Sequence, residues 1–565
     1  MLSYRKLAMR VLGRPLHTGG SDSPRPASQR AAAFVLTAAM LITLTAPAFA
    51  GTWYIEDGNI TISAGTEAGT NKVEQVGKDT VNNDKDTVIT NREDKASSNT
   101  VTIDAGNDKV EVTLKDVNID TSSRNNAAVS VTGEGDTNIK LDGDNALKSD
   151  IYRSGISSSG SLTISGGEND SLTAQGGSGA DGIYSSGSLT ISGGTVTANG
   201  DDGGRGISSS GGVTISGGST VTANGGNGGS IGGGSGIYSN GSVTISGGTV
   251  TANGGKGGSG YGGDGIRSLD HVAISGGTVT ANGGNSTNSS GGYGIISLDV
   301  AISSGTVTAN GGDSKDGYGG DGIHSNGVTI SGGTVNAAGG YGGKVGGYGI
   351  CSFDRVAISG GTVEAAGGNG STGGGSGIYS SVIDLSGSLE LTAKAGSPTG
   401  KALLQNGREL DLDTIKDKLG PGAKVTATDA NGDSKQVSGP RPVEPEEPVI
   451  PEESSSSSDG GSATPSAPVS PLPGLTVTDK DGQRISYTST QSGNTLTVCV
   501  GRLTASLHVS LAALRQLRAE GIETITFQTI LCSTTLSVDE LLAMGGEDAE
   551  AVLTHRFTDS SLTVG

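Results

Sequence analysis

The chain has 565 residues, of which 101 are glycine and only 3% are aromatic, and its formal net charge is −20. This composition excludes the large, irregular aromatic core of an ordinary globular enzyme. The acidic balance excludes nucleic acid and anionic membranes as partners and disfavours bare acidic polysaccharide, because these ligands need clustered Lys and Arg, or a divalent cation between two acidic surfaces.

Residues 1–50 have the features of a secretory signal peptide. Arg5, Lys6 and Arg10 begin a basic region, the apolar run AAAFVLTAAMLITLTAP follows, and AFA ends at Ala50 as a small-residue cleavage site. An uncleaved membrane anchor is the alternative, but the apolar run is short for a membrane span. We therefore expect a protein that is secreted or held at the extracellular cell surface, without membrane insertion after signal cleavage.

Residues 51–155 contain less regular and more charged segments that are still strand-like, among them NITIS, TVTID and NIKLDGDNAL. Apolar and polar residues alternate within these segments, which is typical of strands with one buried face. We interpret them as diverged N-terminal coils of the repeat that follows, with the segment WYI that begins at Trp53 as a cap.

Residues 156–400 repeat a unit whose landmark is ISGG or a near copy of it, at intervals of 24 to 30 residues. Each unit contains three alternating segments, GIYS, SVTIS and TVTAN in one copy, separated by Gly or Asn-Gly. Three short strands cannot bury a face alone, but stacked copies pair in parallel and enclose Ile, Val and Leu. The pattern predicts an all-β fold, a right-handed parallel β-helix with three short strands and about 28 residues per coil.

A calcium-loaded nonapeptide β-roll is the alternative fold, but GGSGYGGDGI at Gly257 resembles its motif only once in a much longer period. Two further features agree with the β-helix. The recurring asparagines of the third strands predict an amide ladder: Asn199, Asn224, Asn253, Asn282 and Asn310. Glycine-rich insertions all fall between the third strand and the next Gly-Ile pair, so we expect them along one edge of the cylinder.

Residues 401–438 are expected to end the β-helix, and residues 439–474 form a linker rich in Pro, Ser and Glu. Residues 475–565 predict a small α+β accessory domain that resembles modules in surface proteins of Gram-positive bacteria and could bind a surface-protein partner. Its helices are expected after the N-cap Ser510 and from the capping box SVDE at Ser537. Cys499 and Cys532 could pair, which would leave Cys351 as a free thiol.

Two columns of side chains are expected on the outside of the β-helix, because alternation directs the isoleucine of GIYS inward and the next residue outward. The first-strand column consists of Ser157, Tyr184, Ser208, Tyr238, Arg267, Ile296, His324, Cys351 and Tyr379. The residues before each Gly-Ile pair form the pre-glycine column: Ser154, Asp181, Arg205, Ser235, Asp264, Tyr293, Asp321, Tyr348 and Ser376.

Tyrosines and acids of these columns are the candidate contacts for a sugar chain. Tyr184 and Tyr238 lie two coils apart, about 10 Å at the usual strand spacing, which suits aromatic platforms under alternate sugars. The predicted carbohydrate-binding residues are Tyr184, Tyr238, Asp264, Arg267, Tyr293, Asp321, His324, Tyr348 and Tyr379. Asp264 and Asp321 are also the candidate ligands for Ca²⁺, the candidate cofactor. The alternative is that the tyrosines cover glycine-rich turns and the acids provide solubility.

Catalysis would need a more specific arrangement. A polysaccharide lyase on this fold needs acids that hold calcium and a base that abstracts a proton. The candidates on neighbouring coils are Asp264, Arg267, Asp270, Asp321, His324, Asp354 and Arg355. A hydrolase needs two carboxylates about 5 to 9.5 Å apart, which any regular column of acids can provide. We therefore expect a protein that is not an enzyme.

The segment VTLKDVNIDTSSRNNAAVSVTGEGDTNIKLDGDNALKS, from Val112 to Ser149, is followed by SGISSSGSLTISGG. This combination resembles exported carbohydrate-binding β-helix proteins of anaerobic Gram-positive bacteria, whose fold is similar to that of pectate lyases. The resemblance covers residues 51–400 and implies calcium-assisted binding of plant polysaccharide without catalysis. It lies in scaffold positions, so it assigns no individual ligand residue.

We expect an exported, non-catalytic polysaccharide-binding protein. The second hypothesis is a structural or adhesive repeat protein that binds a protein partner, and the third is a polysaccharide lyase. Depletion of a soluble glycan would separate the first from the second, and an unsaturated product that absorbs in the ultraviolet would identify the third.

Overall fold

The computed structural model describes residues 51–440 except 94, and residues 474–479, 482–485, 487–492, 494–500, 504–529, 533–544, 550–555 and 560–564. The predicted signal peptide, most of the predicted linker and Cys532 lie outside the described residues. The chain divides into two compact units, Met1–Glu447 and Pro448–Gly565. In the part of the chain that the structure describes, we find no helix with the length and apolar character that crossing a membrane requires.

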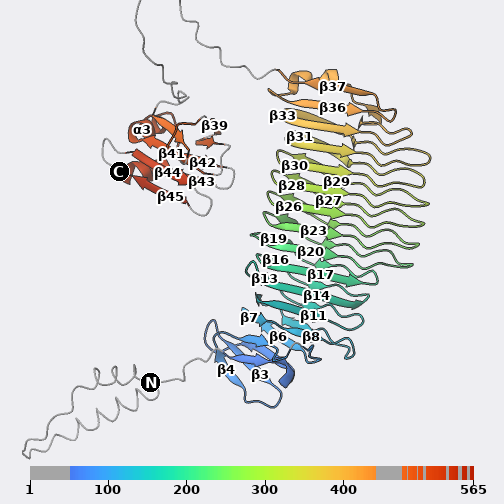
Figure 1. The fold of residues 1–565 in the computed structure, drawn as a ribbon, viewed down its shortest axis with the longest axis vertical. Helices are drawn as coiled ribbons and strands as arrows, with labels where there is room; N and C mark the ends of the chain where they lie inside the picture. The colour runs from blue at the N-terminus through green and yellow to red at the C-terminus, as the bar shows by residue number, and fades with distance from the viewer. Residues whose placement is uncertain are drawn as a thin grey trace, which may run out of the picture. The chain divides into compact units, whose positions relative to one another are not determined.

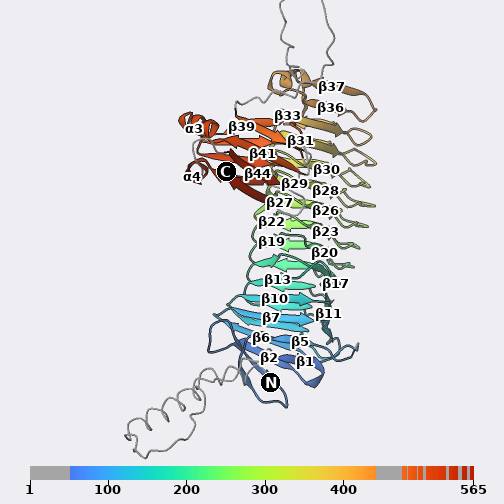
Figure 2. The same ribbon diagram turned by 60° about the vertical axis from the view of Figure 1, so that its left-hand side comes forward.

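The first unit is a parallel β-helix, as the repeat predicts, and its strands stack coil upon coil along one axis (Figure 1). Each regular coil contributes three short strands, such as β21 (Ile237–Ser239), β22 (Val243–Ile245) and β23 (Thr249–Asn253). Each strand of a regular coil pairs in parallel with its counterpart in the neighbouring coils, for example Ile237 with Ile207 and Ile266. Figure 2 shows these counterparts stacked in another view.

The strands of the regular coils follow in three columns. The first column is β12 (Ile156–Ser158), β15 (Ile183–Ser185), β18 (Ile207–Ser209), β21, β24 (Ile266–Ser268) and β32 (Ile378–Ser380). The second is β13 (Leu162–Ser165), β16 (Leu189–Ile191), β19 (Val213–Ile215), β22 and β25 (His271–Ile274). The third is β14 (Ser171–Ser178), β17 (Thr195–Asp201), β20 (Thr220–Asn224), β23, β26 (Thr278–Asn282), β28 (Thr306–Asn310) and β30 (Thr334–Ala338). Longer strands span two or three columns: β27 (Ile295–Ile302), β29 (Ile323–Ile330), β31 (Ile350–Ala366) and β33 (Val382–Lys394).

The core is a narrow stack of identical aliphatic layers. In one coil Ile237, Val243, Ile245, Val250 and Ala252 are all fully buried, and the same positions are buried in the coils above and below. Because each layer pairs with a copy of itself, small side-chain volumes fill the cylinder without aromatic residues. The low aromatic content therefore follows from the architecture.

The glycine-rich insertions lie side by side along one edge of the β-helix (Figure 1), and backbone hydrogen bonds order them. The N–H of Gly255 donates to the carbonyl of Gly234 over 2.8 Å, and the N–H of Gly263 donates to the carbonyl of Gly255 over 2.8 Å. A Cβ atom on Gly263 would lie 1.9 Å from the carbonyl oxygen of Gly234. These glycines therefore allow backbone segments to pack directly on one another.

The N-terminal coils continue the same pairing. The segment contains β1 (Thr52–Tyr54), β2 (Ile60–Ala64), β3 (Asn71–Gln75), β4 (Val81–Asp84), β5 (Val88–Thr90), β6 (Val101–Gly106), β7 (Val110–Lys115), β8 (Asn118–Asp120), β9 (Val129–Gly133), β10 (Thr137–Asp142) and β11 (Asp144–Lys148). A 3₁₀ turn, Ile55–Asp57, follows β1. Strands β2, β6, β9 and β12 are parallel, whereas β3 and β4 form antiparallel pairs that the sequence did not indicate. Trp53 is buried, and its indole N–H donates to Asp84 over 3.0 Å.

The other end of the β-helix is closed by β34 (Leu403–Gln405), β35 (Arg408–Glu409), the 3₁₀ segment Leu412–Lys418, β36 (Lys424–Thr428) and β37 (Ser434–Ser438). Strands β36 and β37 pair in antiparallel fashion, and Leu412 and Ile415 cover the last apolar layer. An antiparallel strand and a short turn of helix leave no parallel edge for a further coil.

The second unit contains two four-stranded sheets in its described residues. One consists of β38 (Leu475–Thr478), β41 (Ala505–Ser510), β44 (Glu550–His555) and β45 (Ser560–Val564), and the other of β39 (Thr488–Ser492), β40 (Thr495–Cys499), β42 (Thr524–Gln528) and β43 (Ser533–Ser537). Helix α3 (Leu511–Ala519) begins where Ser510 accepts the N–H of Ala513, and α4 is Val538–Met544. Cys499 is a free thiol.

Candidate functional site

The first-strand column is aligned as the sequence predicts. Tyr184 pairs with Ser208, Ser208 pairs with Tyr238, and Tyr238 pairs with Arg267 in successive coils. The column continues through Ile296, His324, Cys351 and Tyr379. Because each position is one strand spacing from the next, side chains from many coils form one continuous strip beside the glycine-rich edge.

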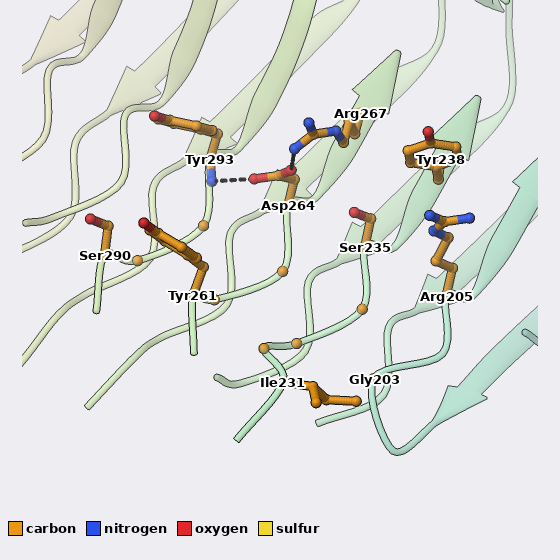
Figure 3. A pocket seen from close by; sticks show the side chains of 17 residues that line it. Gly203, Arg205, Ile231, Ser235, Tyr238, Tyr261, Asp264, Arg267, Ser290 and Tyr293 are labelled. Atoms are coloured by element: carbon orange, nitrogen blue, oxygen red, sulfur yellow. Dashed lines mark hydrogen bonds and ion pairs between the residues drawn. The ribbon is translucent and has the colours of Figure 1, made fainter. Parts of the chain in front are cut away.

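A cavity of about 600 Å³ opens on this strip. Tyr238 and Arg267 line it from the first-strand column, Asp264 and Tyr293 line it from the pre-glycine column, and Tyr261 lines it from a glycine-rich insertion. Figure 3 shows the three tyrosine side chains on successive coils, and glycines of several coils complete the lining. Tyr261 is 67% exposed, and among the described residues none hydrogen-bonds to the hydroxyl of any of these three tyrosines.

The same strip holds a second cavity of about 410 Å³ on the three coils that precede the larger cavity. Tyr184, Asp181, Tyr152 and Arg153 contribute to its lining. Tyr184 and Tyr238 thus line separate cavities in nearby coils, with Arg205 on the intervening coil. The hydroxyl of Tyr184 accepts a hydrogen bond from Ser186 over 3.1 Å, which lowers the pKa of the phenol.

Asp264 is buried, which corrects the expectation that the acids of the pre-glycine column point outward as solubilising groups. Its Oδ1 atom accepts the backbone N–H of Tyr293 over 2.9 Å, and its Oδ2 atom accepts a guanidinium N–H of Arg267 over 3.1 Å (Figure 3). Burial is the main influence on this group and raises the pKa of the Asp264 carboxyl. The acid therefore joins two coils and fixes the direction of Arg267.

Asp321 is buried in an equivalent position two coils further on. Its Oδ1 atom accepts the backbone N–H of Tyr348 over 2.7 Å, and its Oδ2 atom lies 2.7 Å from Nδ1 of His324. The Asp321 carboxylate can be buried because the next coil supplies a backbone N–H that binds it. Periodicity alone predicted the alignment of these acids but not their burial.

Aromatic contacts cover this part of the strip. The ring of Tyr293 stacks on the ring of His324 with a centroid distance of 4.4 Å. The ring of Phe353 contacts the His324 ring edge-on at a centroid distance of 5.2 Å. Tyr348 and Tyr379 stack at 5.1 Å. Burial raises the pKa of the Tyr293 and Tyr348 phenols, which therefore stay neutral. Tyr293, Tyr348 and Tyr379 are thus partly engaged by neighbours.

Tyr238 is engaged on one face only. The guanidinium of Arg205 lies 3.6 Å from the centroid of its ring and also donates to Ser208 over 3.1 Å. A cation over one face of a phenol leaves the opposite face of the ring available to a ligand. Arg205 is a residue that the sequence analysis placed in the pre-glycine column but did not propose as a contact.

Asp270 and Arg355, which were also considered for catalysis, are bound to other side chains. Asp270 accepts the hydroxyl of Ser242 over 2.6 Å and lies 2.9 Å from Nε2 of His271. Arg355 forms an ion pair with Asp384. The lining of the larger cavity includes none of the residues Asp270, Asp354 and Arg355.

The potential metal ligands group differently from the predicted pair of Asp264 and Asp321. In the described residues the ligand atoms of Asp321, His324 and Cys351 lie within 4.8 Å of one another, and Asp264 is not part of this group. Cys351 is buried, although alternation predicted an external side chain. The sequence pattern that could have indicated this group is the presence of His324 and Cys351 at the same column position in consecutive coils.

The fold and this strip define a parallel β-helix with an aromatic and charged surface beside its glycine-rich edge. Five segments match the family model described as a beta helix repeat: residues 189–212, 243–266, 272–295, 300–327 and 328–350. These segments are similar to that family and include most of the coils that form the larger cavity. No curated protein and no solved structure matches the chain significantly.

Proposed function

We propose that the protein is an exported, non-catalytic polysaccharide-binding β-helix. The observation that carries the proposal is the cavity of about 600 Å³ in which Tyr238, Tyr261 and Tyr293 surround Arg267 and Asp264. Aromatic faces pack on the apolar faces of sugar rings, and hydroxyl and guanidinium groups bind sugar hydroxyls. This mixture is suited to an uncharged or weakly charged polyol.

The placement of the two cavities favours an extended ligand over a single small sugar. The larger cavity takes side chains from the four coils of Arg205 to Tyr293, and the smaller one takes side chains from the three coils before them. Seven coils at one strand spacing each correspond to about 29 Å between the first and the last. A polysaccharide that follows the stacking axis would contact both cavities.

The local charge is consistent with this ligand class. Asp264 is paired with Arg267, and Arg205 is the other charged residue that lines the larger cavity, so this lining is not acidic although the whole chain carries −20. A neutral or weakly acidic glycan therefore meets no strong charge repulsion at this position. Calcium remains a proposal for this surface, and a chelator arm in the experiment tests it.

Binding of the purified full-length protein to a panel of insoluble and immobilised polysaccharides, measured with added calcium and with chelator, tests the proposal. We expect retention on at least one polysaccharide and about a tenfold loss of affinity in the Tyr238→Ala/Tyr261→Ala variant. Tyr318→Ala is the matched control, because Tyr318 is 53% exposed on the same edge but does not line the larger cavity.

Other outcomes of this experiment would change the proposed function or its proposed site. Equal binding by the double variant and the wild type would remove the cavity from the proposal. Failure to bind any polysaccharide would overturn it in favour of a structural or adhesive repeat protein with a protein partner. Accumulation of an unsaturated product that absorbs in the ultraviolet would identify a polysaccharide lyase.

A further inference from the structure

Asp321, His324 and Cys351 place three different metal-ligating groups in one cluster. An imidazole nitrogen, a carboxylate oxygen and the Cys351 sulfur lie within 4.8 Å of one another. Asp321 and His324 are three residues apart at the start of one coil, and Cys351 is the strand partner of His324 in the next coil. The stacking of coils therefore brings the third group to the first two.

The cluster is enclosed. Asp321 is 6% exposed and Cys351 is 3% exposed, and the ring of His324 is held between Tyr293 and Phe353. Ionisable groups rarely lie so close together in a buried place, because removing a charge from water is costly unless a partner compensates for it. A positive charge bound next to Asp321 would therefore stabilise its buried carboxylate.

The coil of Asp264 shows how the same frame is compensated elsewhere. There the residue three positions on is Arg267, whose guanidinium binds the carboxylate, and the next residue in the column is Ile296. In the frame of Asp321 these two positions hold His324 and Cys351. A fixed cation and an apolar residue are therefore replaced by two side chains that can ligate a metal ion.

We propose that Asp321, His324 and Cys351 form a binding site for a divalent transition-metal ion of borderline softness, with Zn²⁺ as the best fit. Thiolate, imidazole and carboxylate together are typical ligands of Zn²⁺, whereas Ca²⁺ is bound by oxygen atoms alone. Three protein ligands leave a fourth position of the tetrahedron for water or another small ligand.

The separations suit this ion after small side-chain adjustments. Ligand atoms at usual zinc distances are about 3.3 to 3.7 Å apart in a tetrahedron. The pair from Asp321 and His324 is 2.7 Å apart and would open slightly, and no separation in the group exceeds 4.8 Å. Binding forms three metal–ligand bonds, the thiol proton leaves to solvent, and the imidazole binds through an unprotonated nitrogen.

Cobalt titration of the purified full-length protein tests the site independently of any polysaccharide. The protein is treated with chelator under reducing conditions, and Co²⁺ is added as the probe. The starting variant is Cys499→Ser/Cys532→Ser, so that Cys351 is the only thiol in the chain. We expect one Co²⁺ per chain, a thiolate-to-cobalt charge-transfer band in the near ultraviolet, and loss of the band when Zn²⁺ is added but not when Ca²⁺ is added.

His324→Arg is the matched substitution, because it rebuilds the ion pair that Arg267 forms with Asp264. This variant should keep the β-sheet circular dichroism spectrum and lose the cobalt band, and Cys351→Ser should lose the band as well. Absence of the band in the starting variant would overturn the proposal. Retention of the band in folded His324→Arg, or displacement of Co²⁺ by an equal concentration of Ca²⁺, would overturn it too.

Discussion

The backbone N–H of Tyr293 donates to Oδ1 of Asp264 over 2.9 Å, so a buried carboxylate of one coil binds the backbone of the next. Tyr348 and Asp321 repeat this relationship over 2.7 Å. The acids of the pre-glycine column thus connect coils as well as line the surface. Their structural and ligand-binding roles can be separated by substitutions that keep or remove the hydrogen-bond acceptor.

Asp264→Ala should destabilise the β-helix by about 2 kcal/mol, because it leaves the N–H of Tyr293 without an acceptor and Arg267 without its carboxylate. Asp264→Asn keeps an oxygen in place of Oδ1 and should cost less. Amide hydrogen exchange at Tyr293 and the midpoint of urea unfolding measure the two effects. Equal protection of the Tyr293 amide in the alanine variant and the wild type would contradict the assigned hydrogen bond.

Gly263→Ala should destabilise the β-helix by about 3 kcal/mol, because the added Cβ atom would lie 1.9 Å from the carbonyl oxygen of Gly234. Gly218→Ala is the control: a Cβ atom there meets nothing within 4 Å, and we expect no loss of stability. Thermal unfolding followed by circular dichroism compares the two variants. A similar midpoint for both would mean that the glycine-rich edge is not packed as described.

The amide ladder is confirmed, with successive asparagines joined by hydrogen bonds of 2.8 Å. Asn253→Ala removes two of these bonds and should cost about 2 kcal/mol, whereas Asn310→Ala removes one and should cost about half as much. Alanine itself is compatible with this position, because Ala338 continues the column. The free energies of unfolding of the two variants give the comparison, and equal values would argue against the ladder as the source.

The fold could be predicted from the sequence because the repeat makes each coil bury the same alternating residues. Ile237 and its counterparts stand at fixed positions in each unit, so their stacking follows from periodicity alone. The alignment of Tyr184, Tyr238 and Arg267 follows by the same reasoning. In the regular coils the strand register is set because equivalent residues of successive repeats pair with one another.

The environment of each aligned residue was less predictable, since it depends on how neighbouring coils differ. Asp264 is buried by its contacts with Tyr293 and Arg267, and Cys351 is buried although its column is external. Tyr261 lies in a glycine-rich insertion whose length varies between coils. The periodicity of the strands therefore does not predict where its side chain lies. Long-range contacts between coils therefore determine the candidate site beyond what alternation indicates.

The proposed metal site predicts a pH dependence with a defined sign. Burial and the nearby Asp321 carboxylate raise the pKa of the Cys351 thiol, so the metal-free thiol is protonated at neutral pH. The other groups near it are His324 and the neutral phenols of Tyr293 and Tyr348.

A metal ion must displace the thiol proton, so affinity falls as the pH falls. Below the pKa of the thiol, each displaced proton weakens the apparent affinity for Co²⁺ by about tenfold per pH unit. Titration of the cobalt band between pH 8 and pH 6, in the variant with Cys351 as its only thiol, measures this slope. Proton release in weak buffer should accompany the band, and an affinity independent of pH would mean that the thiolate is not a ligand.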